Sequence, residues 1–157
     1  LAVKLGYPEL LENVEGFIDL SNIGIMNRGI LQKQTKTFLS TVLSSSGSIE
    51  KNAFLNYAGT SQKEFTEFVL NTKYHYLLAP LVKENHLDIP QFAVIKDNYL
   101  TDFYSRSKTV AFGPLPLLAL INAKEVEEKN LRLFVAGLNN GFSKELLKER
   151  MRKISGL

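Results

Sequence analysis

Three charged residues lie in the middle of an otherwise apolar helical stripe. At about 100° per residue, residues 117–138 present one apolar face, made of Leu117, Leu120, Ile121, Leu131, Phe134, Val135 and Leu138. Lys124, Glu127 and Glu128 fall on the same face, between its two apolar parts. Carboxylates beside a basic residue could serve as a general acid and a general base. Charges on an inward face could instead pair with a neighbouring helix.

The spacing of these charges argues against acid–base catalysis. Three pairs have the four-residue spacing of ion pairs on a helix surface: Glu125 with Lys129, Lys124 with Glu128, and Glu128 with Arg132. Carboxylates that are neutralised in this way are poor acids and bases. We therefore expect the stripe either to pair with charges from another helix or to line a hydrated cavity, and both arrangements describe a scaffold.

Other residues that could support catalysis or metal binding are sparse. His75 and His86 are the only histidines and there is no cysteine, whereas a structural zinc site needs four nitrogen or sulfur ligands. The serine-rich stretch 40–48 lacks the lysine and the spacing of a phosphate-binding loop. No Gly-x-Ser-x-Gly sequence is present. We expect no catalytic residue, no cofactor and no metal site.

Composition indicates one ordinary globular chain. Its 157 residues are 45% hydrophobic and 22% charged, and the formal net charge of +3 is too small to indicate nucleic-acid binding. No apolar run reaches the roughly 18–20 residues that a membrane span requires. The first residue is Leu rather than Met, and we interpret the chain as a piece of something longer.

Apolar residues recur with helical spacing throughout, and no convincing alternating run occurs. The sequence therefore predicts an all-α fold of six to eight helices. Proline and glycine positions and potential capping residues place the expected segments: a helix over 8–33, a linker over 40–48, a helix after Ser61, a bend at Pro80, helices from Pro90 and from 113–116 to about Gly137, and a last helix from Ser143 through Met151 and Ile154.

Two short similarities suggest an internal duplication. Residues 59–70 resemble residues 141–151, and Asp19-x-x-Asn22 with Arg28 resembles Glu127-x-x-Asn130 with Arg132. The two alignments imply different offsets, so the duplication would need a large insertion. Within one helical chain of residues 1–157, we expect sub-repeats over 8–70 and 90–155 that are joined by 71–89.

Taken together, several motifs resemble the C subunit of A-type and V-type ATPases, which is the d subunit in the eukaryotic vacuolar enzyme. Residues 123–153, "AKEVEEKNLRLFVAGLNNGFSKELLKERMRK", are similar to the closing signature of that family, and "FIDLSNIGIMNRGI" (17–30) is similar to a second signature. "KDNYL" (96–100) and "GPLPLLA" (113–119) stand in the expected order. The chain departs from the family pattern at Leu120, Asn122 and Ala93.

The resemblance implies a funnel-shaped, all-helical protein of three pseudo-repeats, of which this chain would be the C-terminal half. Such a protein is a non-catalytic rotor subunit of the central stalk. It would act as a socket between the central-shaft subunits of the ATP-hydrolysing head and the membrane proteolipid ring during proton or sodium transport. The resemblance further implies a peripheral position on the cytoplasmic face of a membrane, with no nucleotide bound.

Inside such a funnel, the charged stripe would tie the repeats together. We expect a structural ion-pair network made of Asp19, Arg28, Lys124, Glu125, Glu127, Glu128 and Arg132. Arg28 would pair with a carboxylate of the stripe, and Asp19 with Arg132 would form a second pair. A fragment that lacks a repeat should expose apolar surface and self-associate.

Two other classes of protein fit the sequence less well. One is an unrelated all-α adaptor or interaction module, which stacked helix pairs contacting only their neighbours would support. The other is a small helical enzyme that uses Glu125, Glu127 or His75, which a deep pocket gathering these residues would support.

Overall fold

The computed structural model describes residues 6–106 and 112–154. These residues form eight α-helices, one 3-10 turn and a two-stranded hairpin, so the predicted all-α class is confirmed. The chain divides into two compact units, unit 1 over Leu1–Phe92 and unit 2 over Ala93–Leu157. The predicted sub-repeat boundaries at 8–70 and 90–155 stay a prediction, and residue 155 lies outside the described part of the chain.

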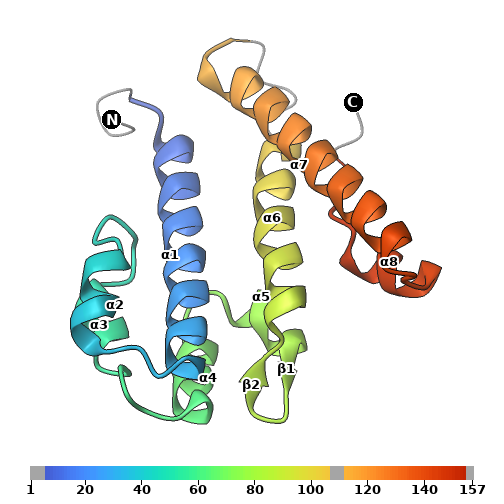
Figure 1. Cartoon of the computed structure of the whole chain (residues 1–157). Helices are drawn as coiled ribbons and strands as arrows, with labels where there is room; N and C mark the ends of the chain where they lie inside the picture. Colours follow the sequence, from blue (N-terminus) through green and yellow to red (C-terminus); the bar gives the residue numbers. More distant parts are fainter. Residues whose placement is uncertain (1–5, 107–111, 155–157) are drawn as a thin grey trace. The chain divides into compact units, whose positions relative to one another are not determined.

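Unit 1 is built around one long helix, α1, which spans Pro8–Leu31 (Figure 1). Its first residue is a proline, whose missing N–H costs nothing in a first helical turn. The elements that follow are α2 (Lys36–Val42), α3 (Lys51–Leu55), α4 (Gln62–Leu70), α5 (His75–Leu78), the 3-10 turn η2 (Ala79–Leu81), β1 (Val82–Lys83) and β2 (His86–Leu87). Helices α2, α3 and α4 all contact α1.

Capping residues explain where the short helices of unit 1 begin. The hydroxyl oxygens of Thr35 and Ser61 accept hydrogen bonds from the amides of Phe38 and Glu64, at 3.2 and 3.3 Å. The predicted helix after Ser61 is therefore confirmed, but the predicted linker over 40–48 is partly wrong. Its first residues belong to the capped helix α2.

The strands β1 and β2 form an antiparallel hairpin that the sequence pattern did not predict. Val82 pairs with Leu87 and Lys83 pairs with His86. The two turn residues Glu84 and Asn85 both have positive φ, of 49° and 64°, as tight hairpin turns require. Strands of two residues are too short to show an alternating pattern.

The core of unit 1 lies against one face of α1. Its fully or nearly fully buried apolar side chains are Leu20, Ile23, Met26, Leu39, Phe54, Phe65, Val69, Tyr74, Leu78 and Leu87. Aromatic contacts connect α3 with α4 and the turn between them, for example Tyr57 stacked on Phe68 with the ring centroids 4.6 Å apart.

The helix α6 spans Ile89–Arg106 and runs from unit 1 into unit 2, where α7 (Pro114–Asn139) and α8 (Lys144–Arg150) follow. These bounds agree with the predicted helix starts near Pro90, at 113–116 and after Ser143. The predicted last helix is too long, since Met151 has extended dihedral angles and Ile154 lies beyond the helix.

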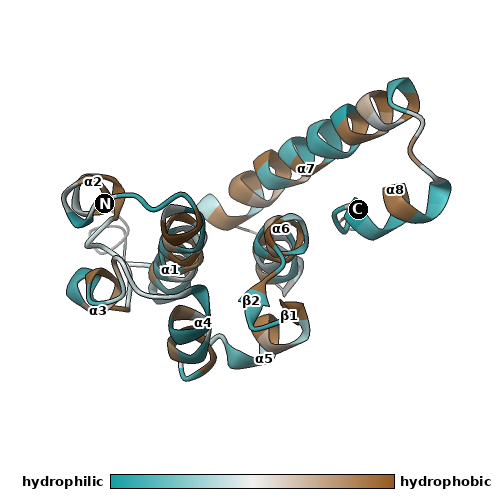
Figure 2. Ribbon diagram, turned by 60° about the horizontal axis from the view of Figure 1, so that its bottom comes forward, coloured by the Kyte–Doolittle hydropathy of each residue, from teal (hydrophilic) through white to brown (hydrophobic). Residues whose placement is uncertain are grey.

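Unit 2 buries a different face of α7 from the one that its apolar pattern indicates. The buried residues of α7 are Leu115, Asn122, Val126, Asn130 and Gly137. The apolar stripe of the sequence is exposed, from Leu117 at 62% to Leu138 at 60%. In Figure 2, hydrophobic and hydrophilic segments alternate along α7. The apolar pattern therefore marks a surface that the described part of unit 2 leaves uncovered.

Candidate functional site

Among the described residues, each unit contains one buried carboxylate surrounded by hydrogen-bond donors. In unit 1 this is Asp19 of α1, whose side chain is fully buried. Its Oδ2 accepts hydrogen bonds from the hydroxyls of Ser48, at 2.6 Å, and Tyr74, at 2.7 Å. Its Oδ1 accepts one from the amide of Ile49 at 3.0 Å. Asp19 thereby connects α1 to the loop after α2 and to the segment before α5.

The carboxylate of Asp19 also has a cation nearby. The Nζ of Lys73 lies 3.8 Å from Oδ2, and the Lys73 side chain is half-exposed. A buried carboxylate that accepts three hydrogen bonds and has a cation near it is compensated for the loss of solvent. Gly47 makes the close approach of the serine-rich loop possible, because a Cβ at this position would collide with the Asp19 carboxylate.

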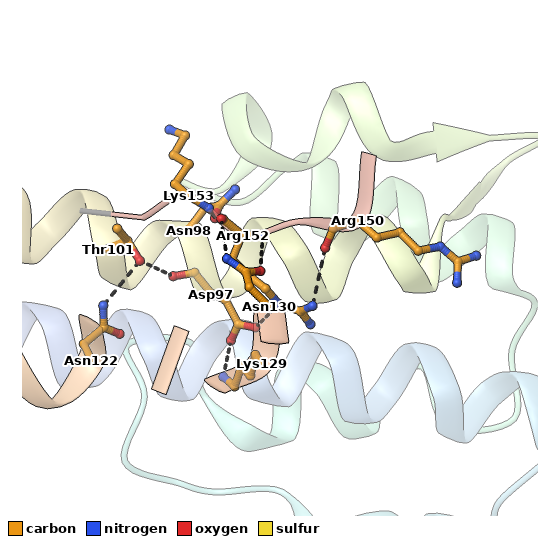
Figure 3. A network of polar contacts seen from close by, with 9 residues as sticks. All are labelled: Asp97, Asn98, Thr101, Asn122, Lys129, Asn130, Arg150, Arg152 and Lys153. Carbon is orange, nitrogen blue, oxygen red and sulfur yellow. Dashed lines mark hydrogen bonds and ion pairs between the residues drawn. The ribbon is translucent and has the colours of Figure 1, made fainter. Parts of the chain in front are cut away.

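In unit 2 the buried carboxylate is Asp97 of α6 (Figure 3). One carboxylate oxygen lies 2.9 Å from the Nζ of Lys129 on α7, and the other lies 2.9 Å from the Nε of Arg152, just after α8. The carboxylate therefore joins three successive parts of unit 2. Sequence reasoning missed this cluster, although Asp97 belongs to the "KDNYL" motif.

Asparagine side chains hold the segment after α8 in place (Figure 3). Asn130 accepts a hydrogen bond from the Arg152 amide at 2.9 Å and donates one to the Arg152 carbonyl at 3.0 Å. Asn98 accepts one from the Lys153 amide at 2.8 Å. Backbone groups that have no partner in a helix are thereby satisfied.

A third polar contact of unit 2 connects α6 and α7. The side-chain amide of Asn122 donates to the hydroxyl of Thr101 at 3.3 Å, and that hydroxyl donates to the Asp97 carbonyl at 3.2 Å. Burial raises the pKa of Tyr104 above its ordinary value of 10, and the Glu125 carboxylate raises it further. Asn122, where the sequence departs from the family pattern, thus has a structural role here.

These two clusters connect segments that are far apart in the sequence. Both carboxylates are held by hydrogen-bond donors or cations from neighbouring segments. The described residues contain no group of three or more His, Asp or Glu side chains that could hold a metal ion. His75 is exposed, with its Nδ1 2.9 Å from the carbonyl oxygen of Leu70.

Two open cavities, of about 500 and 450 Å³, lie in unit 1. One is lined by the end of α1 and residues 59–62, and the other by the hairpin and the start of α6. Neither is lined by Glu125, Glu127 or His75, the residues that an enzyme was expected to use.

The predicted ion-pair residues of α7 pair within the helix. The Nζ of Lys124 lies 2.8 Å from the Oε2 of Glu127, and the Nη2 of Arg132 lies 2.5 Å from the Oε1 of Glu128. The second of these pairs has the predicted four-residue spacing, whereas Lys124 pairs with Glu127 rather than with Glu128. Both pairs are exposed, and pairs of this kind contribute roughly 0–1 kcal/mol.

The predicted pairs between distant segments stay predictions. Arg28 donates from Nε to the Gly24 carbonyl at 3.2 Å on its own helix. Its expected carboxylate partner and Arg132, the expected partner of Asp19, belong to the other unit. Lys129, which was expected to pair with Glu125, instead pairs with Asp97.

The comparisons with known proteins decide the family. The model of the family described as "ATP synthase (C/AC39) subunit" matches residues 2–150. The chain belongs to this family. It is also 51% identical, over all 157 residues, to the C subunit of the V-type sodium ATPase of Enterococcus hirae. The chain spans 48% of that relative's length, and no solved structure matches it.

Membership of the ATP synthase (C/AC39) subunit family relates the chain to rotary-ATPase subunits, as the motifs 17–30 and 123–153 indicated. Both buried clusters include residues of these motifs, since Asp19 belongs to the first and Lys129, Asn130 and Arg152 belong to the second. Among the described residues, no helix has the length and hydrophobicity needed to cross a membrane.

Proposed function

We propose that the chain is part of a non-catalytic central-stalk subunit of a rotary A-type or V-type ATPase. The subunit acts as a socket between the central shaft of the ATP-hydrolysing head and the membrane proteolipid ring. It transmits torque during proton or sodium transport, as a peripheral subunit on the cytoplasmic face of the membrane.

One observation carries this proposal: the identity of 51% to the C subunit of a V-type sodium ATPase extends over the whole chain. The clusters around Asp19 and Asp97 support it, because they lock helices to their neighbours. A part that transmits torque must resist deformation, and satisfied buried polar networks rigidify a fold.

A binding experiment tests the proposal directly. The longer protein that contains this chain is immobilised and exposed separately to a purified central-shaft complex and to a proteolipid ring in detergent. We expect it to retain both, and to show no ATP hydrolysis of its own. Retention of neither would contradict the socket function. ATP hydrolysis by the isolated protein would contradict its non-catalytic role.

A further inference from the structure

The long helices α1 and α7 are followed by segments with the same hydrogen-bond pattern. The side chain of Asn22 binds both backbone groups of Ser44, accepting at 3.0 Å and donating at 2.9 Å. Asn130 binds Arg152 in the same way, at 2.9 and 3.0 Å. In each case the two residues are 22 positions apart. Residue 22 thus corresponds to residue 130, which sets the register for the whole comparison.

The turns that follow the two long helices agree in this register. The backbone N–H of Gln34 donates to the Gly29 carbonyl, and the backbone N–H of Phe142 donates to the Gly137 carbonyl, both at 2.8 Å. Between these residues Lys33 and its counterpart, Gly141, both have positive φ, of 53° and 68°.

The short helices α2 and α8 also correspond. Each has seven residues and a hydroxyl N-cap. Each packs a buried leucine on a glycine of the long helix. A Cβ on Gly29 would lie 2.5 Å from Leu39 Cδ2, and one on Gly137 would collide with Leu147. The alignment of 59–70 with 141–151 is therefore replaced by one of 33–43 with 141–151.

In this register the buried face of α1 corresponds to the exposed face of α7. On α1 this face consists of five residues, each at most 2% exposed. The five corresponding residues of α7 are all exposed, and the apolar ones among them are 50–60% exposed. The corresponding pairs are Asp19 and Glu127, Leu20 and Glu128, Ile23 and Leu131, Met26 and Phe134, and Asn27 and Val135.

The cover on α1 comes from the elements that follow α2. Helix α4 packs on α1, the Tyr74 and Ser48 hydroxyls donate to Asp19, and the Leu87 carbonyl accepts from Asn27. The described part of unit 2 contains no counterpart of α4 or of these donors. Helix α7 therefore has a face that corresponds to the buried face of α1, but the described part of unit 2 lacks the elements that would cover this face.

We propose that the exposed face of α7 binds a helix from the rest of a longer polypeptide of which this chain is a part. That helix would pack an apolar side on Leu131, Phe134 and Val135. The segment beside it would donate hydrogen bonds to Glu127, as Ser48 and Tyr74 do to Asp19.

Three observations favour this occupant over a second copy of the chain. The elements that cover α1 belong to the same polypeptide as α1, and the Enterococcus hirae relative has about as much sequence again outside the matched part. The face also carries the carboxylates Glu127 and Glu128. A second copy would bring the same two acids, whereas an α4-like element can bring neutral or basic donors.

Cysteine labelling tests the proposal, because the 157 residues contain no cysteine. Val135→Cys reports on the proposed face. Ala136→Cys is the matched control, since its counterpart Arg28 is exposed on α1. Maleimide labelling rates are measured at low protein concentration, in the 157-residue chain and in the longer protein with any other cysteines replaced.

We expect Val135→Cys to label at least about tenfold more slowly in the longer protein than in the 157-residue chain, because a covered side chain reacts only after local opening. Ala136→Cys should label at similar rates in both. Equal rates for Val135→Cys in the two proteins would overturn the proposal. Slow labelling of Val135→Cys in the longer protein that speeds up on dilution would also overturn it, in favour of a second copy.

A second variant tests the hydrogen bonds to Glu127. In the longer protein, Glu127→Ala should lower the melting temperature by about 2 °C or more. In the 157-residue chain the same substitution removes only an exposed ion pair, so the melting temperature should change little. Equal shifts in the two proteins would contradict the predicted donors. Neither experiment involves the shaft or the ring, so the inference can fail independently of the proposed function.

Discussion

Asp97 shows how a single side chain can organise unit 2. It is 7% exposed and contacts Lys129 of α7 and Arg152 of the segment after α8. Asp102, on the same helix, pairs in a comparable way with Lys153, but the side chains of both residues are half-exposed. The two carboxylates therefore form similar pairs in different surroundings, and they provide a matched comparison.

We predict that Asp97→Asn destabilises the chain more than Asp102→Asn does. The first change leaves Arg152, only 17% exposed, without its carboxylate partner, and should cost about 1–3 kcal/mol. The second removes an exposed pair and should cost roughly 0–1 kcal/mol. Urea unfolding of the two variants measures the difference. Equal free energies of unfolding would show that the Asp97 cluster does not hold unit 2 together.

Tyr104 predicts a dependence of stability on pH. Because burial raises its pKa above 10 in the folded chain, the unfolded chain loses this proton at a lower pH than the folded chain. The contribution to stability is full below about pH 10 and declines as the pH rises from there through the folded pKa. The wild type has six tyrosines. Without Tyr104, the free energy of unfolding of the Tyr104→Phe variant should depend less strongly on pH in this range than that of the wild type. Parallel curves would contradict the raised pKa.

Sequence reasoning identified the charged residues of α7 but not the buried clusters. Charge spacing along one helix is visible in a sequence, and it gave the Glu128–Arg132 pair. The contact of Asp97 with Arg152 joins residues 55 positions apart, and only the packing of three helical segments brings them together. The asparagines were visible as a repeated motif, yet their backbone partners depend on where α2 and α8 end.

At the scale of the elements, helix starts were predictable and burial was not. Prolines and capping hydroxyls act locally, so Pro8, Ser61 and Ser143 mark helix starts in the sequence as in the structure. An apolar stripe identifies the face that packs on something, but not where the covering element lies in the polypeptide. This is why the stripe of α7 appeared to be a core face and is exposed.

The contact between Gly137 and Leu147 should control the docking of α8. We predict that Gly137→Ala destabilises unit 2, because the new Cβ collides with the Leu147 side chain and overpacking typically costs about 1–3 kcal/mol. In a Leu147→Ala background the same change should cost much less, since the obstructing side chain is gone. Thermal unfolding of the four proteins gives the coupling. Additive effects would contradict a direct collision.

At the scale of the whole molecule, the exposed face of α7 predicts self-association of the 157-residue chain. Large apolar patches rarely stay exposed on monomers, and Leu131, Phe134 and Val135 form such a patch. Sedimentation velocity at rising concentration should show dimers or larger species, and Phe134→Lys should shift them toward monomer. A monomer at high concentration would contradict this prediction.

The proposed function assigns to the subunit the mechanical coupling between ATP hydrolysis and ion transport. The most direct measurement is ATP-driven ion uptake into vesicles that carry a rotary ATPase depleted of the subunit to which this chain belongs. We predict that uptake is lost on depletion and returns when the purified longer protein is added back, while the protein alone hydrolyses no ATP. Ion uptake that is unchanged by depletion, or that does not return when the longer protein is added, would contradict the proposed function.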